Sequence, residues 1–241
     1  MRSDGRADTD LRPVSFEMGI NGWAEGSCLM TLGNTRVHVT ASADDKVPPF
    51  LRGKGQGWVH AEYAMLPRAT RERTVREVVR GRVQGRTAEI QRLIARSLRA
   101  VTDLSLLGEK SYTVDVDVIQ ADGGTRTAGV TAGFMALAQA VRAAQPGVRP
   151  FSDWLGAVSV GLKEGTVLLD LAFDEDSAID VDFNCAMTAG HRLVEIQGTA
   201  EHALFSIPQL AAMMAAASDG IDRLVAAMRA AWPEGEELLA R

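Results

Sequence analysis

The chain has 241 residues, of which 46% are hydrophobic and 24% charged, and its formal net charge is −5. This composition is ordinary for a globular protein, and its acidity argues against a general nucleic-acid coat protein. No apolar run approaches the roughly 20 residues that span a bilayer, and the first residues lack the apolar segment of a signal peptide. Two cysteines are too few for a disulfide framework or a cysteine-based zinc site. We expect Cys28 and Cys185 to be buried free thiols in a cytoplasmic protein with no membrane partner.

The first third of the chain has the residue pattern of β-strands. Gly33 and Asn34 predict a hairpin turn between two of these strands, because both residues tolerate positive φ. Pro67 ends the last strand of this part, because proline cannot donate a hydrogen bond to a sheet. The expected strands are Val14–Met18, Ala24–Leu32, Arg36–Ala43 and Val59–Leu66.

A basic segment follows these strands. Between Arg68 and Arg86 the chain holds seven arginines, opposed by Glu72 and Glu77. A local basic patch on an acidic protein favours phosphate binding, although a solvated loop or an ion-paired subunit interface would have the same composition. The segment leads into a predicted helix, because apolar residues then recur on one helical face. These residues are Ile90, Leu93, Ile94, Leu98 and Val101.

The stretch from Ser111 to Thr127 predicts an anion site. Valines alternate with Asp115 and Asp117, which is typical of a half-buried strand. The strand runs into Gly123-Gly124-Thr125-Arg126, and the small residues of Ala128–Ala144 predict a tightly packed helix. A helix N-terminus after a glycine turn binds anions through free N–H groups and the helix dipole, and an arginine adds a bidentate grip. Gly85-Arg86-Thr87 repeats this arrangement.

The second half repeats the order of strands followed by a helix. Ser206 is the expected N-cap of the last helix, and Gly220 is a possible interruption. This order predicts an α+β fold in one domain, 1–241, with two fused lobes at roughly 1–148 and 149–241. The expected elements are a hairpin of Ala157–Leu162 and Thr166–Phe173, an acidic turn at Asp174–Asp176, strands at Asp180–Met187 and Leu193–Gln197, and a helix at Ile207–Ala231.

Several carboxylates gather around the acidic turn. On a strand, Asp180 and Asp182 would share a face, and Asp176 could approach them from the turn. Such a group suits Mg²⁺, which takes one or two carboxylates plus waters and substrate phosphates. Spacing alone favours a solvated acidic loop, but an adjacent anion site favours the metal. The chain has no zinc-protease, P-loop or nucleophile-elbow motif.

Together these motifs resemble the ribonuclease PH family over nearly the whole chain. The resemblance implies the α+β fold of that family (two-layer α/β, like domain 2 of ribosomal protein S5), with two β-α-β units. The matching segments include Arg2–Arg6, Leu11-Arg12-Pro13-Val14, Gly53–Val59, Ala61-Glu62-Tyr63, Met65–Arg68, Gly85-Arg86-Thr87, Glu89–Ile94, Gln120–Thr127, Glu175–Ala178 and Gly198–Glu201.

The resemblance further implies a phosphate-dependent 3′–5′ exoribonuclease and tRNA nucleotidyltransferase. Such an enzyme removes the nucleotides that follow the 3′-CCA end of transfer RNA precursors, releases nucleoside 5′-diphosphates, and can add nucleotides in reverse. Processing or decay of ribosomal RNA is a further role of this family. Its members form a homohexamer, a trimer of dimers.

Residue roles follow from the same resemblance. The phosphate-binding positions are Arg86, Gly124, Thr125 and Arg126. Asp176 and Asp182 match acidic positions associated with Mg²⁺ or Mn²⁺ and with catalysis, and Asp180 or Asp182 is the alternative general acid. Arg68, Arg73 and Arg76 match a segment linked to assembly and transfer RNA binding. A non-catalytic RNA-binding ring subunit and a hydrolytic nuclease are the competing interpretations, and dependence on phosphate separates all three.

Overall fold

The computed structural model describes residues 2–240, apart from the side chain of residue 80. Nine strands and four α-helices form its regular structure. The strands are β1 (Val14–Met18), β2 (Gly26–Leu32), β3 (Thr35–Asp44), β4 (Trp58–Met65), β5 (Ser111–Gln120), β6 (Leu155–Lys163), β7 (Thr166–Leu169), β8 (Val181–Thr188) and β9 (Leu193–Ala200). The α-helices are α1 (Gly85–Ala100), α2 (Thr125–Ala144), α3 (Phe173–Asp176) and α4 (Ile207–Ala231), and the 3₁₀ helices are Pro49–Leu51, Glu77–Arg80 and Pro233–Leu238.

The strands form two sheets, which confirms the α+β class. The first has the order β1-β2-β3-β5-β4, and the second has the order β7-β6-β8-β9. β4 and β5 pair in parallel, so that β4, α1 and β5 form a β-α-β unit. The other pairs of named strands are antiparallel.

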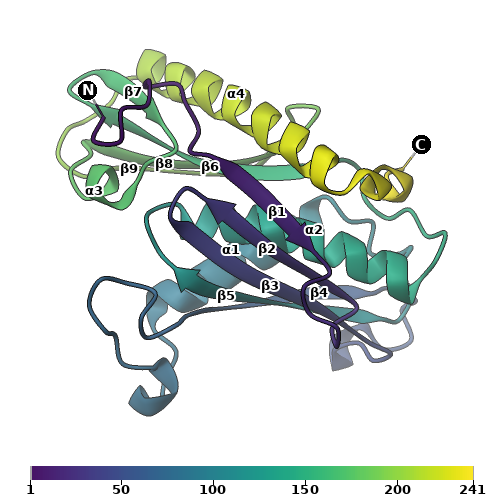
Figure 1. The fold of residues 1–241 in the computed structure, drawn as a ribbon. Helices are drawn as coiled ribbons and strands as arrows, with labels where there is room; N and C mark the ends of the chain where they lie inside the picture. The colour runs from purple at the N-terminus through teal and green to yellow at the C-terminus, as the bar shows by residue number, and fades with distance from the viewer. Residues whose placement is uncertain (1, 241) are drawn as a thin grey trace.

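Helix α2 lies between the two sheets and positions the site. It packs on β2 and β3 of one sheet and on β6 of the other, while α4 covers β6 from the opposite face (Figure 1). Its small residues let its neighbours approach closely: a Cβ on Gly129 would lie 3.1 Å from Ile94 Cδ1 of α1. The run of small residues is therefore a consequence of burial on several sides.

The strands and helices expected from local patterns are confirmed to within a few residues. Helix α4 has the predicted bounds, and Ser206 caps it by accepting a hydrogen bond from Gln209 N. The expectation that Gly220 interrupts this helix is wrong. A Cβ at Gly220 would lie 2.8 Å from Leu169 Cδ1, so the glycine allows α4 to approach β7 closely.

The expected strand Thr166–Phe173 is too long. It ends at Leu169 because Asp170 adopts φ 57°, which breaks extended backbone. The acidic segment that follows is a short helix, α3, rather than an open turn. Asp170 and Glu175 in these segments form buried ion pairs with Arg12 and Arg2 of the N-terminal segment, contacts that no local pattern reveals.

The two cysteines are buried free thiols, as predicted. Burial raises the pKa of the Cys28 thiol to about 12, with a smaller contribution from Glu17. Burial also raises the pKa of the Cys185 thiol to about 12. Both therefore remain protonated and unreactive at neutral pH. Within residues 2–240, no helix has the length and apolar character needed to cross a membrane.

Candidate active site

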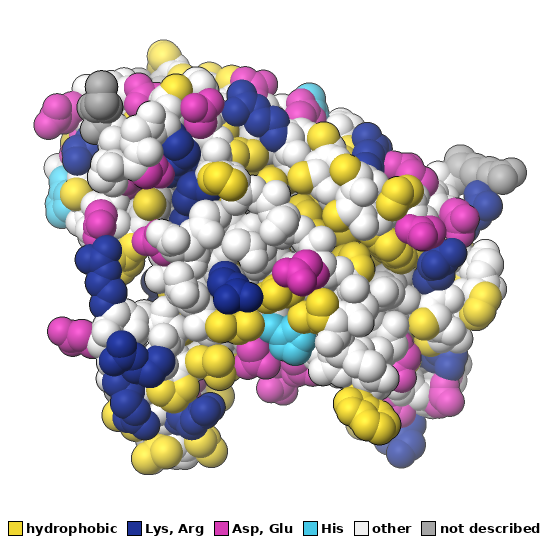
Figure 2. All heavy atoms as spheres, in the orientation of Figure 1, with side chains coloured by type: hydrophobic (Ala, Val, Ile, Leu, Met, Phe, Trp, Pro, Cys, Tyr) yellow, Lys and Arg dark blue, Asp and Glu magenta, His cyan; other side chains and the backbone are white. Residues whose placement is uncertain are grey.

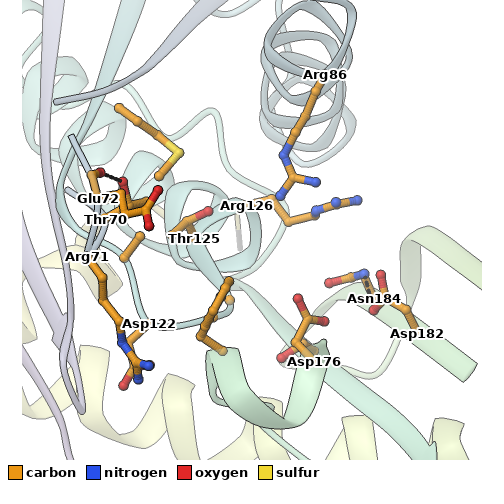
Figure 3. Close-up of a pocket in the computed structure, with 16 residues that line it drawn as sticks. Thr70, Arg71, Glu72, Arg86, Asp122, Thr125, Arg126, Asp176, Asp182 and Asn184 are labelled. Atoms are coloured by element: carbon orange, nitrogen blue, oxygen red, sulfur yellow. Dashed lines mark hydrogen bonds between the residues drawn. The ribbon is translucent and has the colours of Figure 1, made fainter. Parts of the chain in front are cut away.

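A cavity of about 540 Å³ lies between the two halves of the chain (Figure 3). It brings together residues that are far apart in sequence: Arg86 from α1, Arg126 from α2, Asp176 from α3 and Asp182 from β8. Both predicted anion sites and two of the predicted carboxylates therefore line a single space.

A glycine turn places the start of α2 against this cavity. Gly123 has φ 78° and Gly124, the N-cap of α2, has φ 67°, conformations that favour glycine. A Cβ on Gly123 would also lie 2.3 Å from the carbonyl oxygen of Leu171, so no larger residue fits the observed backbone. The first N–H groups of α2 have no partner within the helix and, with the helix dipole, favour an anion.

Two arginines add full positive charge to this helix terminus. Figure 3 shows the side chains of Arg86 and Arg126 extending toward the same region, across from the two aspartates. Arg126 Nη1 donates to Gln197 Oε1 at 3.2 Å, and Gln197 Nε2 donates to Glu89 Oε1 at 3.1 Å. Gln197 thus ties α2 to α1 and restricts the position of the Arg126 guanidinium.

The charges of Arg86 and Arg126 both reach the hydroxyl of Tyr63, which lies at the start of α2. Burial raises the pKa of its hydroxyl, while a hydrogen bond with Thr125 and the charges of Arg86 and Arg126 oppose that rise. Tyr63 Oη lies 2.9 Å from Thr125 Oγ1, which anchors the first residue of α2 to β4.

Asp176 and Asp182 form the acidic side of the cavity. Desolvation raises the pKa of the Asp182 carboxyl, as does the nearby charge of Asp176, whereas Arg126 and a hydrogen bond from Asn184 at 3.0 Å oppose the rise. The Asp176 side chain keeps contact with solvent, yet desolvation by the surrounding protein raises its pKa against the charges of Arg126 and Arg86. A nearby cation would therefore stabilise the ionised form of both carboxylates.

The residues present fit a divalent cation that also contacts substrate. No group of three or more histidine, cysteine or acidic side chains within residues 2–240 is arranged to hold a metal. Mg²⁺ needs only one or two carboxylates when waters and phosphate oxygens complete its shell. Asp176 and Asp182, whose charges repel each other on the same side of the cavity, supply those two.

The structure does not bring Asp180 into the cavity. Its carboxylate accepts a hydrogen bond from Glu164 N at 2.6 Å, and its carbonyl accepts from the backbone N–H groups of Glu201 and His202. It precedes β8 and holds the turn between β6 and β7. The expectation that Asp180 and Asp182 present their carboxylates on one strand face is thus not met.

The predicted basic segment is an exposed projection between β4 and α1. Figure 1 shows it extending at the lower left, and dark blue side chains gather there in Figure 2. Arg68, Arg73 and Arg76 are exposed on it. Arg71 lines the cavity and pairs with Asp174 at 3.2 Å.

Sequence reasoning missed the buried N-terminal ion pairs that support the site. Arg12 donates from Nη2 to Asp170 Oδ1 at 2.7 Å and from Nη1 to the Asp122 carbonyl beside the glycine turn. Arg2 donates to Glu175 at 2.6 Å, next to Asp176. The matched segments contain Arg2, Arg12 and Glu175, but only the folded chain reveals what these side chains contact.

The chain matches known proteins along nearly its whole length. Residues 10–143 match the profile of the 3′ exoribonuclease family, domain 1, and residues 153–220 match domain 2 of that family. It is 54% identical over 230 residues to ribonuclease PH of Moorella thermoacetica, covering 94% of this chain and 92% of the relative. It is 52% identical to ribonuclease PH of Bacillus subtilis, covering 93% and 94%.

Solved structures at lower identity show the same fold. The Archaeoglobus fulgidus exosome with RNA bound to the active site matches with a TM-score of 0.79 at 21% identity, covering 93% of this chain and 91% of the other. Rice (Oryza sativa) Rrp46 matches with a TM-score of 0.77 at 17% identity, covering 95% and 98%. The two family profiles and the sequence relatives show that the chain belongs to the 3′ exoribonuclease family and is an enzyme of the ribonuclease PH type.

Proposed function

We propose that this cavity removes nucleotides from the 3′ end of RNA by phosphorolysis, with the residue roles given below. Membership of the ribonuclease PH family makes the protein a phosphorolytic 3′–5′ exoribonuclease of transfer RNA. One observation supports the roles: two arginines and a helix N-terminus share a cavity with two carboxylates. A hydrolase would have no need of a second anion site beside the substrate phosphate.

The arginine side of the cavity holds inorganic phosphate. Arg86, Arg126 and the N–H groups of the Gly124–Arg126 turn offset the repulsion between an anionic nucleophile and the anionic RNA backbone. A phosphate oxygen attacks the phosphorus of the last phosphodiester, and the bond from that phosphorus to the 3′ oxygen of the preceding nucleotide breaks. The terminal nucleotide leaves as a nucleoside 5′-diphosphate, and the 3′ oxygen of the shortened RNA takes a proton.

The acidic side of the cavity serves the leaving oxygen. Asp176 and Asp182 would hold Mg²⁺ or Mn²⁺, which when bound would neutralise charge on the phosphoryl and leaving oxygens. As an alternative to holding the metal, Asp182 would act as the general acid that delivers the proton, because desolvation raises the pKa of its carboxyl. Asp180 has a structural role instead, since its carboxylate is held by the Glu164 N–H. The diphosphate product conserves bond energy, so the same site adds nucleotides in reverse.

The projecting segment supports proposals about assembly and RNA binding. Its exposed arginines, among them Arg68, Arg73 and Arg76, suit an RNA backbone. Its exposed valines, Val75, Val78, Val79 and Val83, suit burial against another subunit. We infer a homohexamer in the cytoplasm that acts on transfer RNA precursors and on ribosomal RNA.

The first experiment is an exonuclease assay on a transfer RNA with extra 3′ nucleotides, in the presence of Mg²⁺, with and without inorganic phosphate. We expect shortening only with phosphate and release of nucleoside diphosphates. Release of monophosphates without phosphate would indicate hydrolysis. Binding without shortening would indicate a non-catalytic ring subunit. Arg126→Ala should raise the KM for phosphate at least tenfold while RNA binding remains.

A further inference from the structure

The cavity has an aromatic wall that phosphorolysis itself does not use. Phe173, the first residue of α3, lines the cavity with 50% of its surface exposed. It lies three residues before Asp176 on the same short helix, so its ring is next to the proposed metal site. An aromatic side chain left exposed at this place offers a flat apolar surface to whatever occupies the cavity.

A guanidinium group faces the same ring. The Cζ atom of Arg71 lies 6.0 Å from the centroid of the Phe173 ring, and Arg71 Nη2 pairs with Asp174 Oδ2 at 3.2 Å. The Arg71 side chain is 76% exposed, so it can shift without disturbing the core. A planar group inserted between two flat surfaces needs about 7 Å, two stacking contacts of roughly 3.5 Å. The observed separation of 6.0 Å is about 1 Å short of this, a difference that movement of the exposed Arg71 side chain would supply.

We propose that Phe173 and Arg71 form the subsite for the base of the 3′-terminal nucleotide, which stacks on the ring with the guanidinium on its other face. The assignment rests on the proposed function, because it needs a nucleotide whose phosphate lies at Arg86 and Arg126. Aromatic rings and guanidinium groups both stack on nucleobases, and stacking tolerates every base because each has a π-face. This suits an exonuclease that must remove whichever nucleotide is terminal.

The test of the subsite is the affinity of the protein for nucleoside diphosphates. These are the products of the proposed reaction, and they carry the base and the phosphates in one molecule. Kd values for ADP, GDP, CDP and UDP are measured by calorimetry with Mg²⁺ for the wild type, Phe173→Leu and Phe173→Tyr. We expect Phe173→Leu to raise Kd at least about fivefold for all four, the lower end for loss of one stacked base. Phe173→Tyr should stay within twofold of wild type, because it keeps the ring.

The matched control is Trp23→Leu, which removes an aromatic side chain that is 97% exposed and does not line the cavity. It should leave every Kd unchanged. The KM for inorganic phosphate should stay within twofold in Phe173→Leu, because phosphate has no base to stack.

Two results would overturn the subsite. One is unchanged diphosphate affinity in Phe173→Leu, and the other is an equal rise in the KM for phosphate, which would mean that the ring shapes the phosphate site. Failure of the proposed function is recognised separately. It would appear as phosphate-independent shortening by the wild type, whereas the binding comparison needs no turnover.

Discussion

The ionised Asp182 carboxylate lowers the stability of the fold, although the proposed function needs it. Desolvation and the charge of Asp176 raise the pKa of its carboxyl. An acid whose pKa is raised on folding binds protons more readily in the native state. Its ionisation therefore lowers stability as pH rises from the ordinary range of an aspartate through the raised value. At neutral pH the ionised group is a net cost of folding despite Arg126 and the Asn184 hydrogen bond, and a bound cation would offset that cost.

Asp182→Asn should stabilise the protein and abolish its activity. Without Mg²⁺ at pH 7 we expect a higher Tm, by about 2–4 °C for each kcal/mol relieved in a chain of this size. The difference should narrow as the pH falls and the native carboxyl becomes protonated. Thermal scans across pH, together with phosphorolysis assays, test both effects.

Asp180→Asn is the control for this change. Its amide oxygen can still accept the Glu164 N–H, and its side chain is outside the cavity. Near-normal turnover is expected. An Asp182→Asn protein that turns over at the wild-type rate, or an Asp180→Asn protein that does not turn over, would reverse the assignment of the two carboxylates.

At the scale of elements, the glycine turn joins the two halves of the site. Gly123 combines a positive φ with contact against Leu171 of the second half, and Arg12 holds the neighbouring Asp122 carbonyl. The turn that we propose to bind phosphate is therefore positioned by packing from the second half of the chain. A change in this packing should alter phosphate binding before it alters the sheets.

Gly123→Ala should destabilise the fold by roughly 1–3 kcal/mol, the scale of a strained backbone residue, with added cost from the clash at Leu171. It should also raise the KM for phosphate, because the start of α2 must shift. Gly147→Ala is the matched control: Gly147 has φ 88° with nothing within 4 Å of an added Cβ. The free energy of unfolding is measured in denaturant, and the KM for phosphate by phosphate titration. If backbone strain, rather than the contact with Leu171, were responsible, both quantities would change equally in the two variants.

Local patterns in the sequence were enough to predict most elements but not the supports of the site. The alternation in β5 and the apolar face of α1 depend on neighbours in sequence, and both were confirmed. The end of β7 depends on Asp170, whose carboxylate binds Arg12, 158 residues away in sequence. Pairing over that distance leaves no periodic signal. The same holds for Gln197 and for Phe173, whose surroundings only the folded chain defines.

At the scale of the whole molecule, the projecting segment is the feature that a single subunit does not explain. Arginines and valines are exposed together on it, whereas most of the buried apolar side chains belong to one large core. Exposed apolar groups beside positive charge suit a surface that meets both protein and RNA. The division into lobes near residue 148 and the hexamer remain predictions, and this segment is where assembly can be tested.

Arg76→Ala should weaken transfer RNA binding, ring assembly, or both. Each phosphate contact that is lost should reduce the slope of log affinity against log salt by up to about 0.9. Arg192→Ala is the control, because Arg192 is also exposed but lies in the turn between β8 and β9. Sedimentation separates the two roles: a smaller particle means that Arg76 holds the ring, and an intact particle with a lower salt slope means that it binds RNA directly. If Arg76→Ala keeps both the wild-type sedimentation and the wild-type salt slope, the segment has neither role at this position, and its exposed charge serves solubility alone.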